Sequence, residues 1–175
     1  AEGAVTPVCC VSALLNTGVH TLMNNLVHYM PTADKAPIRP AVNARTGEAV
    51  EIKRDGKFAA QIMKTVADPF VGKISIMKVY AGSIDATFAA YAEKSEKSGA
   101  VYMMRGKNLI NVDKLCAGDI GAMAKLQFTN TGDTLTDPAE PVKFAPIEFP
   151  APCISLAVSA KKQGEEDKVF AGINR

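Results

Sequence analysis

The chain has 175 residues, of which 47% are hydrophobic and 22% charged, and its formal net charge is +2. At roughly 100–200 residues per domain, this length allows one domain, or a domain with attached pieces. The ordinary apolar fraction and the mixed charges exclude a disordered or collagen-like protein, and the longest nearly apolar stretch, residues 5–15, is shorter than the roughly 18 residues of a membrane span. We therefore expect a soluble globular protein.

The first part, residues 1–31, is predicted to be a strand, a turn and a helix. Residues 8–11 form an apolar run typical of a buried strand, and a polar turn at residues 16–18 follows. Apolar residues then recur at helical spacing from Val19 to Met30, and Pro31 ends the pattern. Such a unit cannot bury its own apolar face, so we expect it to pack on something else.

A proline-rich linker at residues 32–40 leads into a long region, residues 41–148, that looks like β structure throughout. Runs of strand-forming residues alternate there with glycine-containing turns; the runs cover residues 58–65, 73–80, 84–91, 99–105 and 119–126. The alternation of apolar and polar residues breaks at residues 77–79, which predicts a β-bulge. Many short strands with no helical stretch among them favour a closed β-barrel or a sandwich.

The last part, residues 149–175, offers one strand at residues 153–158 and a polar stretch at residues 161–168 that looks like the start of a helix. The predicted fold is therefore mainly β, with an antiparallel β-barrel between a short strand–helix piece and a truncated strand–helix start.

The cysteines include one vicinal pair and two isolated residues: Cys9, Cys10, Cys116 and Cys153. This is a poor disulfide framework, and no C-x-x-C pattern is present. His20 and His28 are the only histidines, and their spacing is not that of zinc ligands. No charged segment precedes the apolar stretch at residues 5–15, so we predict no secretory signal. We expect reduced, mostly buried thiols, no metal site and a cytoplasmic protein.

Charge is unevenly distributed along the β region. Residues 53–107 contain ten basic and five acidic residues, a net charge of +5, whereas residues 108–148 have a net charge of −3. This pattern predicts a basic face and an acidic face. Basic clustering is the electrostatic footprint of a phosphate-binding surface, and a solvated barrel surface remains the alternative from charge alone.

Several short strings, in order along the chain, carry a family resemblance. They are VSA at residues 11–13, GV at 18–19, YMP at 29–31, DPFVGKI at 68–74, KVYAGSI at 78–84, AGDI at 117–120, TGDTL at 131–135 and FPAPCIS at 149–155. Together they resemble the elongation factor G family of translational GTPases. The resemblance implies that residues 1–31 close a GTP-binding domain, residues 41–148 are a translation-factor-type β-barrel (domain II), and residues 149–175 begin domain III.

In that family a GTPase domain drives translocation on the ribosome, and the second domain docks on small-subunit ribosomal RNA and relays the nucleotide state. The sequence contains neither a G-x-x-x-x-G-K-[ST] loop nor an Asn-Lys-x-Asp string. We therefore expect no catalytic residue and no cofactor in this chain, which looks like an excised piece of a larger GTPase. The resemblance implies GTP and Mg²⁺ in the parent protein, and the ribosome and the parent's own domains as partners, with no membrane and no DNA.

Two groups of candidate site residues follow. Ser12 and Ala13 resemble the last guanine-contact motif of the GTPase domain; the structural alternative is a strand-to-helix turn in which Ser12 caps the following helix. For RNA contact, basic residues in the loops flanking residues 99–105 are the first choice, and two lysines of the run at residues 73–80 are weaker choices: Lys94, Lys97, Arg105 and Lys107, then Lys73 and Lys78. Lysine and arginine neutralise phosphates, so such binding would depend on salt and not on sequence.

Two alternatives to a translocation factor stay open. Residues 103–106 read MMRG where the family carries a Met-His-Ala-Asn-like string, so the chain could belong to a diverged paralogue or to a tetracycline-resistance-type ribosomal protection factor. The other alternative, from a different class, is a β-barrel protein-interaction module without ribosome binding.

Overall fold

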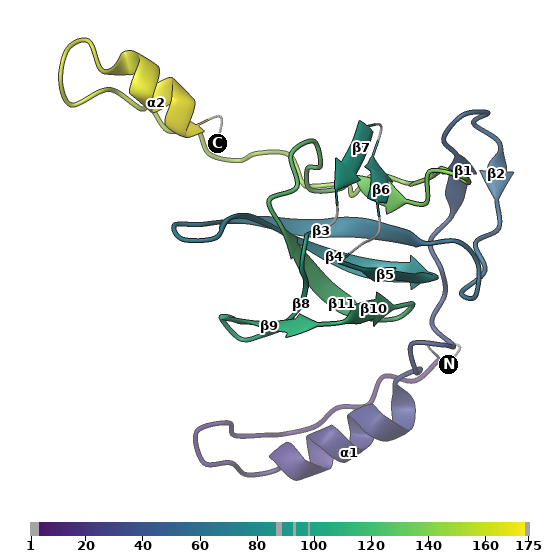
Figure 1. Cartoon of the computed structure of the whole chain (residues 1–175). Coiled ribbons are helices and arrows are strands. Elements are labelled where there is room, and N and C mark those ends of the chain that lie inside the picture. Colours follow the sequence, from purple (N-terminus) through teal and green to yellow (C-terminus); the bar gives the residue numbers. More distant parts are fainter. Residues whose placement is uncertain (1–3, 87–88, 93, 98, 174–175) are drawn as a thin grey trace.

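A computed structural model of the chain describes residues 4–86, 89–92, 94–97 and 99–173. Figure 1 shows a β domain in the middle, with one helix standing off it on each side, α1 (Val19–Tyr29) and α2 (Glu166–Ile173). The strands of the β domain pair in antiparallel fashion throughout. The predicted mainly β, antiparallel fold is therefore confirmed.

The described strands, in chain order, are β1 (Ala41–Asn43), β2 (Ala49–Val50), β3 (Ala59–Asp68), β4 (Gly72–Ala81), β5 (Ser83–Asp85), β6 (Ala89–Ala92), β7 (Lys94–Lys97), β8 (Val101–Arg105), β9 (Asn108–Val112), β10 (Lys114–Cys116), β11 (Ile120–Ala124), β12 (Thr134–Thr136) and β13 (Val142–Phe144). Eight of them form a sheet in the order β7-β6-β12-β3-β4-β11-β8-β9. A three-stranded sheet, β13-β1-β2, and the pair β10-β5 complete the domain. Four of the five predicted runs each match one strand, and residues 84–91 match β5 and β6 on either side of residues 87–88, which lie outside the described residues.

The long β3–β4 hairpin contains two irregularities, and neither lies at residues 77–79. The register skips Met63 on β3 and Tyr80 on β4, while Met77 and Lys78 pair without interruption with both β3 and β11. Ser75, Met77 and Val79 are all buried, so the inward alternation continues through the residues where a bulge was predicted. The two irregularities therefore border the predicted position: one faces the step from Ile76 to Met77, and the other directly follows Val79.

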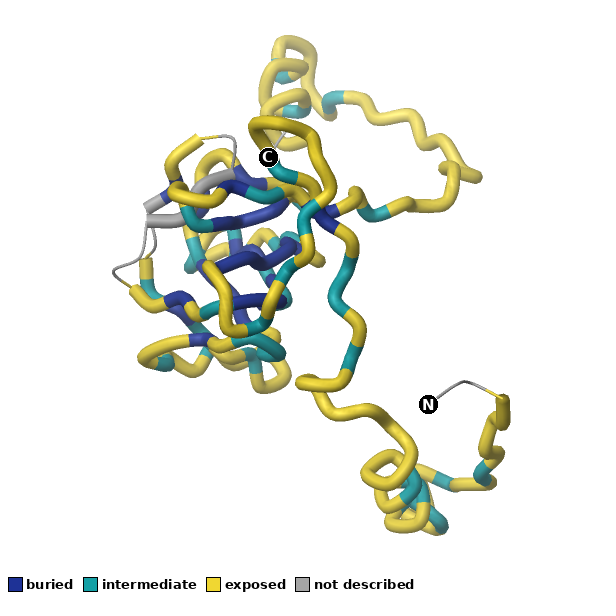
Figure 2. Tube along the Cα trace, turned by 90° about the vertical axis from the view of Figure 1, so that its right-hand side faces the viewer, coloured by how far each residue is buried: buried dark blue, intermediate teal, exposed yellow. Residues whose placement is uncertain are grey.

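The main core of the domain is a cluster of buried apolar side chains from most of its strands. It joins Ile62, Met77, Leu115, Met123 and Leu135, each almost completely buried. In Figure 2 the buried residues are concentrated in this central domain, whereas the segments leading to both termini are mostly exposed. The burial of these apolar side chains stabilises the β domain. The two flanking helices contain no buried residue and so have no core of their own.

A second buried cluster joins the two ends of the domain. β1 pairs with β13, so that Ala41 lies opposite Phe144, and the Phe144 and Tyr80 rings pack with their centroids 4.8 Å apart. Ile38 of the linker packs against the same cluster. The segments that lead into and out of the domain therefore run side by side.

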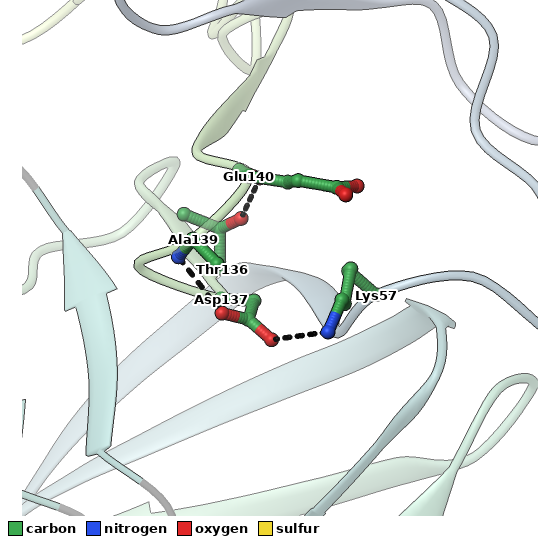
Figure 3. Close-up of polar contacts among 5 residues, drawn as sticks. All are labelled: Lys57, Thr136, Asp137, Ala139 and Glu140. Atoms are coloured by element: carbon green, nitrogen blue, oxygen red, sulfur yellow. Dashed lines mark hydrogen bonds and ion pairs between the residues drawn. The ribbon is translucent and has the colours of Figure 1, made fainter.

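The connection from β12 to β13 is fixed by side chains (Figure 3). The Ala139 N–H donates to Asp137 Oδ1 (2.9 Å), and the Thr136 hydroxyl donates to the Glu140 carbonyl (3.3 Å). Lys57 Nζ lies 3.9 Å from Asp137 Oδ2. This turn directs the chain into β13 and so sets the path by which it leaves the domain.

Glycine is required at one strand junction in particular. Gly82, between β4 and β5, has φ +63°, and a Cβ placed there would lie 2.7 Å from the Phe58 backbone nitrogen. A side chain at this position would be strained by both its own backbone and its neighbour. The glycine predicted from the sequence as a turn residue therefore serves a close backbone approach as well.

The N-terminal piece agrees with the sequence prediction in its turn and its helix, and not in its strand. α1 occupies the predicted residues, but residues 8–11 form no strand, and Val8 is 88% exposed. Ser12 and Thr17 instead form an isolated antiparallel bridge. An apolar run becomes a buried strand only when other strands pair with it, and none of the described residues does so.

The C-terminal piece also differs from the prediction. Residues 153–158, predicted to form a strand, are irregular and exposed. The predicted helix is present, but it begins at Glu166, within the stretch 161–168, and continues to Ile173. The expected buried thiols are wrong as well, because Cys10, Cys116 and Cys153 are exposed and Cys9 is half-buried; all four are free. Neither of the two helices in the described chain has the length and the apolar run needed to cross a membrane.

The predicted separation into a basic and an acidic face does not follow the sheet order. β11 lies between β4 and β8, and β12 lies between β6 and β3, so strands of the acidic segment alternate with strands of the basic one. A charge sum over consecutive residues therefore does not describe one face of this sheet.

Candidate nucleic-acid interface

The β8–β9 hairpin carries two of the predicted cations at its tip. Arg105 ends β8, Lys107 lies in the turn before β9, and both are exposed. Gly106 between them has φ +61°, a conformation that favours glycine and allows a tight turn. No described residue forms an ion pair with either cation. Their charges therefore face solvent, as a phosphate contact requires.

The hairpin extends past the edge of the core. Val101 and Val112 pair at its base, where Val101 is fully buried and Val112 packs on the core. Met103 and Ile110 pair next, and they are 43% and 42% exposed. The tip is therefore held by the sheet at one end and free of protein neighbours at the other, a geometry that can enter a groove of a partner.

Lys94 and Lys97 lie in strand β7 rather than in a loop, which corrects the predicted placement. The Lys94 Nζ lies 5.0 Å from the centroid of the Phe128 ring. This is within the range of a cation–π contact. The side chain of Lys97 lies outside the described residues, so only its backbone position in β7 is known.

Lys73 and Lys78 of β4 contact different parts of the domain. Lys73 Nζ donates to the Thr129 carbonyl and lies 3.5 Å from Asn130 Oδ1. Lys78 Nζ lies 5.5 Å from the centroid of the Tyr80 ring, next to the second cluster. The structure thus brings Lys73 and Lys94 together at residues 126–130, places Arg105 and Lys107 at the hairpin tip, and leaves Lys78 apart from both.

Residues 126–130, which we call the Phe128 turn, are held by a buried carboxylate that the sequence prediction did not single out. Glu96 of β7 is 3% exposed and accepts hydrogen bonds from the Gln127 N–H (3.0 Å), the Phe128 N–H (2.6 Å) and the Thr129 hydroxyl (2.6 Å). Burial raises the pKa of Glu96, but the hydrogen bonds outweigh it and lower the pKa below its ordinary value. The carboxylate is therefore ionised and clamps the turn.

The Ser12–Ala13 segment forms a turn closed by backbone bonds between Ser12 and Thr17, both 3.0 Å long. The Ser12 hydroxyl accepts from the Leu15 N–H (3.3 Å) and not from the helix, whose N-cap is Gly18. The predicted capping by Ser12 is therefore wrong, while the predicted turn is present. No described residue accepts from the Ala13 N–H, which leaves that group available to an external acceptor.

The acidic side chains of the two Gly-Asp turns serve the fold of the β domain. No group of three or more His, Cys, Asp and Glu side chains among them could hold a metal ion, and the two Gly-Asp turns use their carboxylates internally. Asp119 accepts from the Cys116 N–H (2.8 Å), and Asp133 accepts from the Asn130 N–H (2.7 Å). These acids stabilise turns, as their sequence context predicts.

Two further residues of the interface region escaped the sequence prediction. Phe128 is an exposed aromatic residue in a region chosen for its charges, and Gln61 is a polar residue in the middle of a core strand, 1% exposed. A single sequence offers no signal for Phe128. The only signal for Gln61 is its interruption of the apolar run at residues 58–62.

Comparison with known proteins relates the chain to one family. The family model described as Elongation factor G domain 2 matches residues 57–138. The chain is also 34% identical over 179 residues to proteins named Elongation factor G from Chlamydia trachomatis serovar D and serovar A, and each alignment covers 99% of this chain and 26% of the relative. The chain thus spans about a quarter of the length of these curated relatives.

Among solved structures, a crystal structure of a protein from Thermus thermophilus matches with a TM-score of 0.67. The match covers 90% of this chain and 22% of that one, at 22% sequence identity. At this level of identity the match shows the fold.

Proposed function

Because the chain belongs to the elongation factor G family, we propose that it is a central piece of a GTP-dependent ribosomal translocation factor. In this proposal residues 1–31 close the GTP-binding domain, residues 41–148 are domain II, and residues 149–175 begin domain III. The parent protein would bind GTP and Mg²⁺ and hydrolyse GTP through residues outside this sequence. This piece would dock on small-subunit ribosomal RNA in the cytoplasm and relay the nucleotide state.

The observation that carries the docking proposal is the tip of the β8–β9 hairpin. Arg105 and Lys107 are exposed and free of ion pairs among the described residues, on a hairpin whose base is fixed in the core. Cations held in this way neutralise phosphates without first breaking an internal contact. A rigid edge of this kind suits duplex RNA, which is recognised by shape and by its sugar–phosphate backbone.

The test compares two double variants of the 175-residue chain in binding to purified small ribosomal subunits. We expect R105A/K107A to bind about tenfold more weakly at physiological salt, because two phosphate contacts are lost. K161A/K162A removes the same charge from the exposed C-terminal piece and serves as the control. Equal affinity of the two variants would refute docking through the hairpin.

The relay proposal is supported by Gln61, which lies between the two segments that flank the domain. Its Oε1 accepts from Arg39 Nη1 of the linker (2.7 Å), and its Nε2 donates to the Ala145 carbonyl just after β13 (2.9 Å) and to the Gly132 carbonyl (3.1 Å). A movement of the linker therefore acts on the outgoing segment through one buried side chain. Buried networks that are fully satisfied in this way make the joined elements rigid.

Hydrogen exchange of Q61M tests the relay. Methionine keeps the volume but removes all three hydrogen bonds, so we expect faster exchange in residues 36–42 and in residues 143–147 together. Gln127→Met, at an exposed glutamine, is the control. Faster exchange on one side only would show that Gln61 stabilises its own strand without coupling the two segments.

The protein-interaction alternative is favoured by one observation, the paired exposed side chains of Met103 and Ile110 on the same hairpin. An apolar contact of this kind would be insensitive to salt, whereas phosphate contacts weaken steeply with it. The salt dependence of binding therefore separates the two functions. Translocation and ribosomal protection would be separated by activity assays of the whole parent protein.

A further inference from the structure

The Phe128 turn presents an aromatic ring on a fixed backbone. Leu126 and Thr129, on either side of Phe128, are 2% and 0% exposed, while Phe128 itself is 46% exposed. The hydrogen bonds to Glu96 hold the backbone N–H of Phe128 and the hydroxyl of Thr129. An exposed ring on an anchored turn loses little conformational entropy when it binds a flat partner.

One lysine lies over this ring, and two more belong to segments next to the Phe128 turn. Lys94 Nζ lies 5.0 Å from its centroid, and Lys73 Nζ is fixed on the Thr129 carbonyl. Lys125, the residue after β11, is exposed, and its backbone N–H donates to the Lys73 carbonyl (2.8 Å). One positive side chain therefore lies over the aromatic ring, a second is bonded to the turn that carries the ring, and a third residue, Lys125, directly precedes that turn. This arrangement favours a partner that combines a π-face with negative charge.

Phe128 also lines a cavity of about 390 Å³ between the Phe128 turn and β13. Thr131, Asp133 and Lys143 supply polar groups to the same cavity, and Phe144 and Ile147 supply apolar ones. This volume lies near the lower end of the range for small-ligand sites, roughly 300–1,000 Å³. The cavity is thus large enough for a single flat group stacked on the ring.

We propose that Phe128 and this cavity receive one unpaired nucleotide of RNA, with the base stacked on the ring and the flanking phosphates near Lys73 and Lys94. Aromatic residues beside lysines are the common way in which proteins bind single-stranded nucleic acid, since every base has a π-face and every linkage a charge. This inference rests on the proposed RNA docking and adds an unpaired nucleotide to the duplex contact of the hairpin.

The experiment uses the absence of tryptophan from the chain. Phe128→Trp introduces a single indole, and its backbone bonds to Glu96 remain. We expect its fluorescence to be quenched, in a saturable way, by a single-stranded oligoribonucleotide and much less by a duplex of the same length. In the wild-type background, F128L should bind the single strand roughly five- to a hundredfold more weakly, whereas F128Y should retain binding.

The outcomes separate this inference from the proposed function. If the chain binds RNA in a salt-dependent way but the indole is not quenched and F128L binds normally, the stacking site is refuted while docking stands. If no RNA binds at low salt, both fail. If an apolar peptide quenches the indole and RNA does not, the site is a protein-binding groove and the inference is overturned. Circular dichroism of F128W and F128L confirms that each variant is folded.

Discussion

The β8–β9 hairpin tip and the Phe128 turn both carry basic residues, but they use them differently. Arg105 and Lys107 at the tip have no ion-pair partner among the described residues, whereas Lys73 and Lys94 at the Phe128 turn contact a carbonyl and a ring of their own chain. Residues of the same type thus lack ion pairs at the tip and already contact their own chain at the turn. We expect changes at the tip to alter binding alone and changes at the turn to alter stability as well.

The largest expected effect is on stability, at the carboxylate under the Phe128 turn. Glu96→Ala should reduce the free energy of unfolding by about 3 kcal/mol, because two backbone N–H groups and a hydroxyl lose a charged acceptor. Urea unfolding measures this loss. Glu140→Ala is the control, since the Glu140 side chain is exposed, and it should change stability by less than about 0.5 kcal/mol.

The same carboxylate predicts a pH dependence. The pKa of Glu96 is lowered in the folded state from its ordinary value of 4.5, so its contribution is fully present above pH 4.5 and is lost as the pH falls through the lower, folded-state pKa. We expect the stability of the wild-type chain to decline at acid pH more than that of Glu96→Gln. Parallel pH profiles for the two proteins would contradict the clamp.

The next effect is on affinity, at the hairpin tip. R105A/K107A should lower the affinity for small ribosomal subunits about tenfold and leave the urea midpoint unchanged, since neither side chain packs on the core. A loss of affinity without a change in the urea midpoint would show that the tip contributes to binding and not to stability. A shift in the midpoint would mean that the tip also supports the fold.

The smallest expected effect is at Lys73, which combines both behaviours. Lys73→Met removes the hydrogen bond to the Thr129 carbonyl and one positive charge. We expect a loss of about 1 kcal/mol in stability and a reduction in RNA affinity smaller than that of the double tip variant. Lys64→Met, at an exposed position on β3, should leave both quantities nearly unchanged, and an equal effect at both lysines would contradict a specific role for Lys73.

Much of the β domain was predictable from the sequence because its strands are bounded by glycines and use strand-forming residues. Gly72 and Gly82 bracket β4, and both have positive φ, as their turn positions predict. The short strands β1 and β13 were not predictable, because three residues give no periodicity and each is defined by its pairing with the other. The strands predicted at residues 8–11 and 153–158 were wrong for the opposite reason. Both segments are apolar runs, but no described strand pairs with them.

The residue types of the candidate site were predictable from the sequence, but the way in which the fold brings those residues together was not. The sequence identifies basic residues, but only the strand order shows that Lys94 of β7 and Lys73 of β4 meet at the same turn. Contacts of this kind depend on residues 31 or more positions apart, such as Glu96 and Gln127, which a local pattern does not reveal. For the same reason, the net charges of consecutive segments did not reveal that strands of the two segments are interleaved in the sheet.

Docking of this chain on ribosomal RNA through phosphate contacts can be measured by the salt dependence of its binding to purified small ribosomal subunits. We expect the logarithm of the affinity to fall linearly with the logarithm of the salt concentration, and the slope to become shallower by about one for each of Arg105 and Lys107 replaced by alanine. Binding that is indifferent to salt, or no binding at low salt, would contradict it.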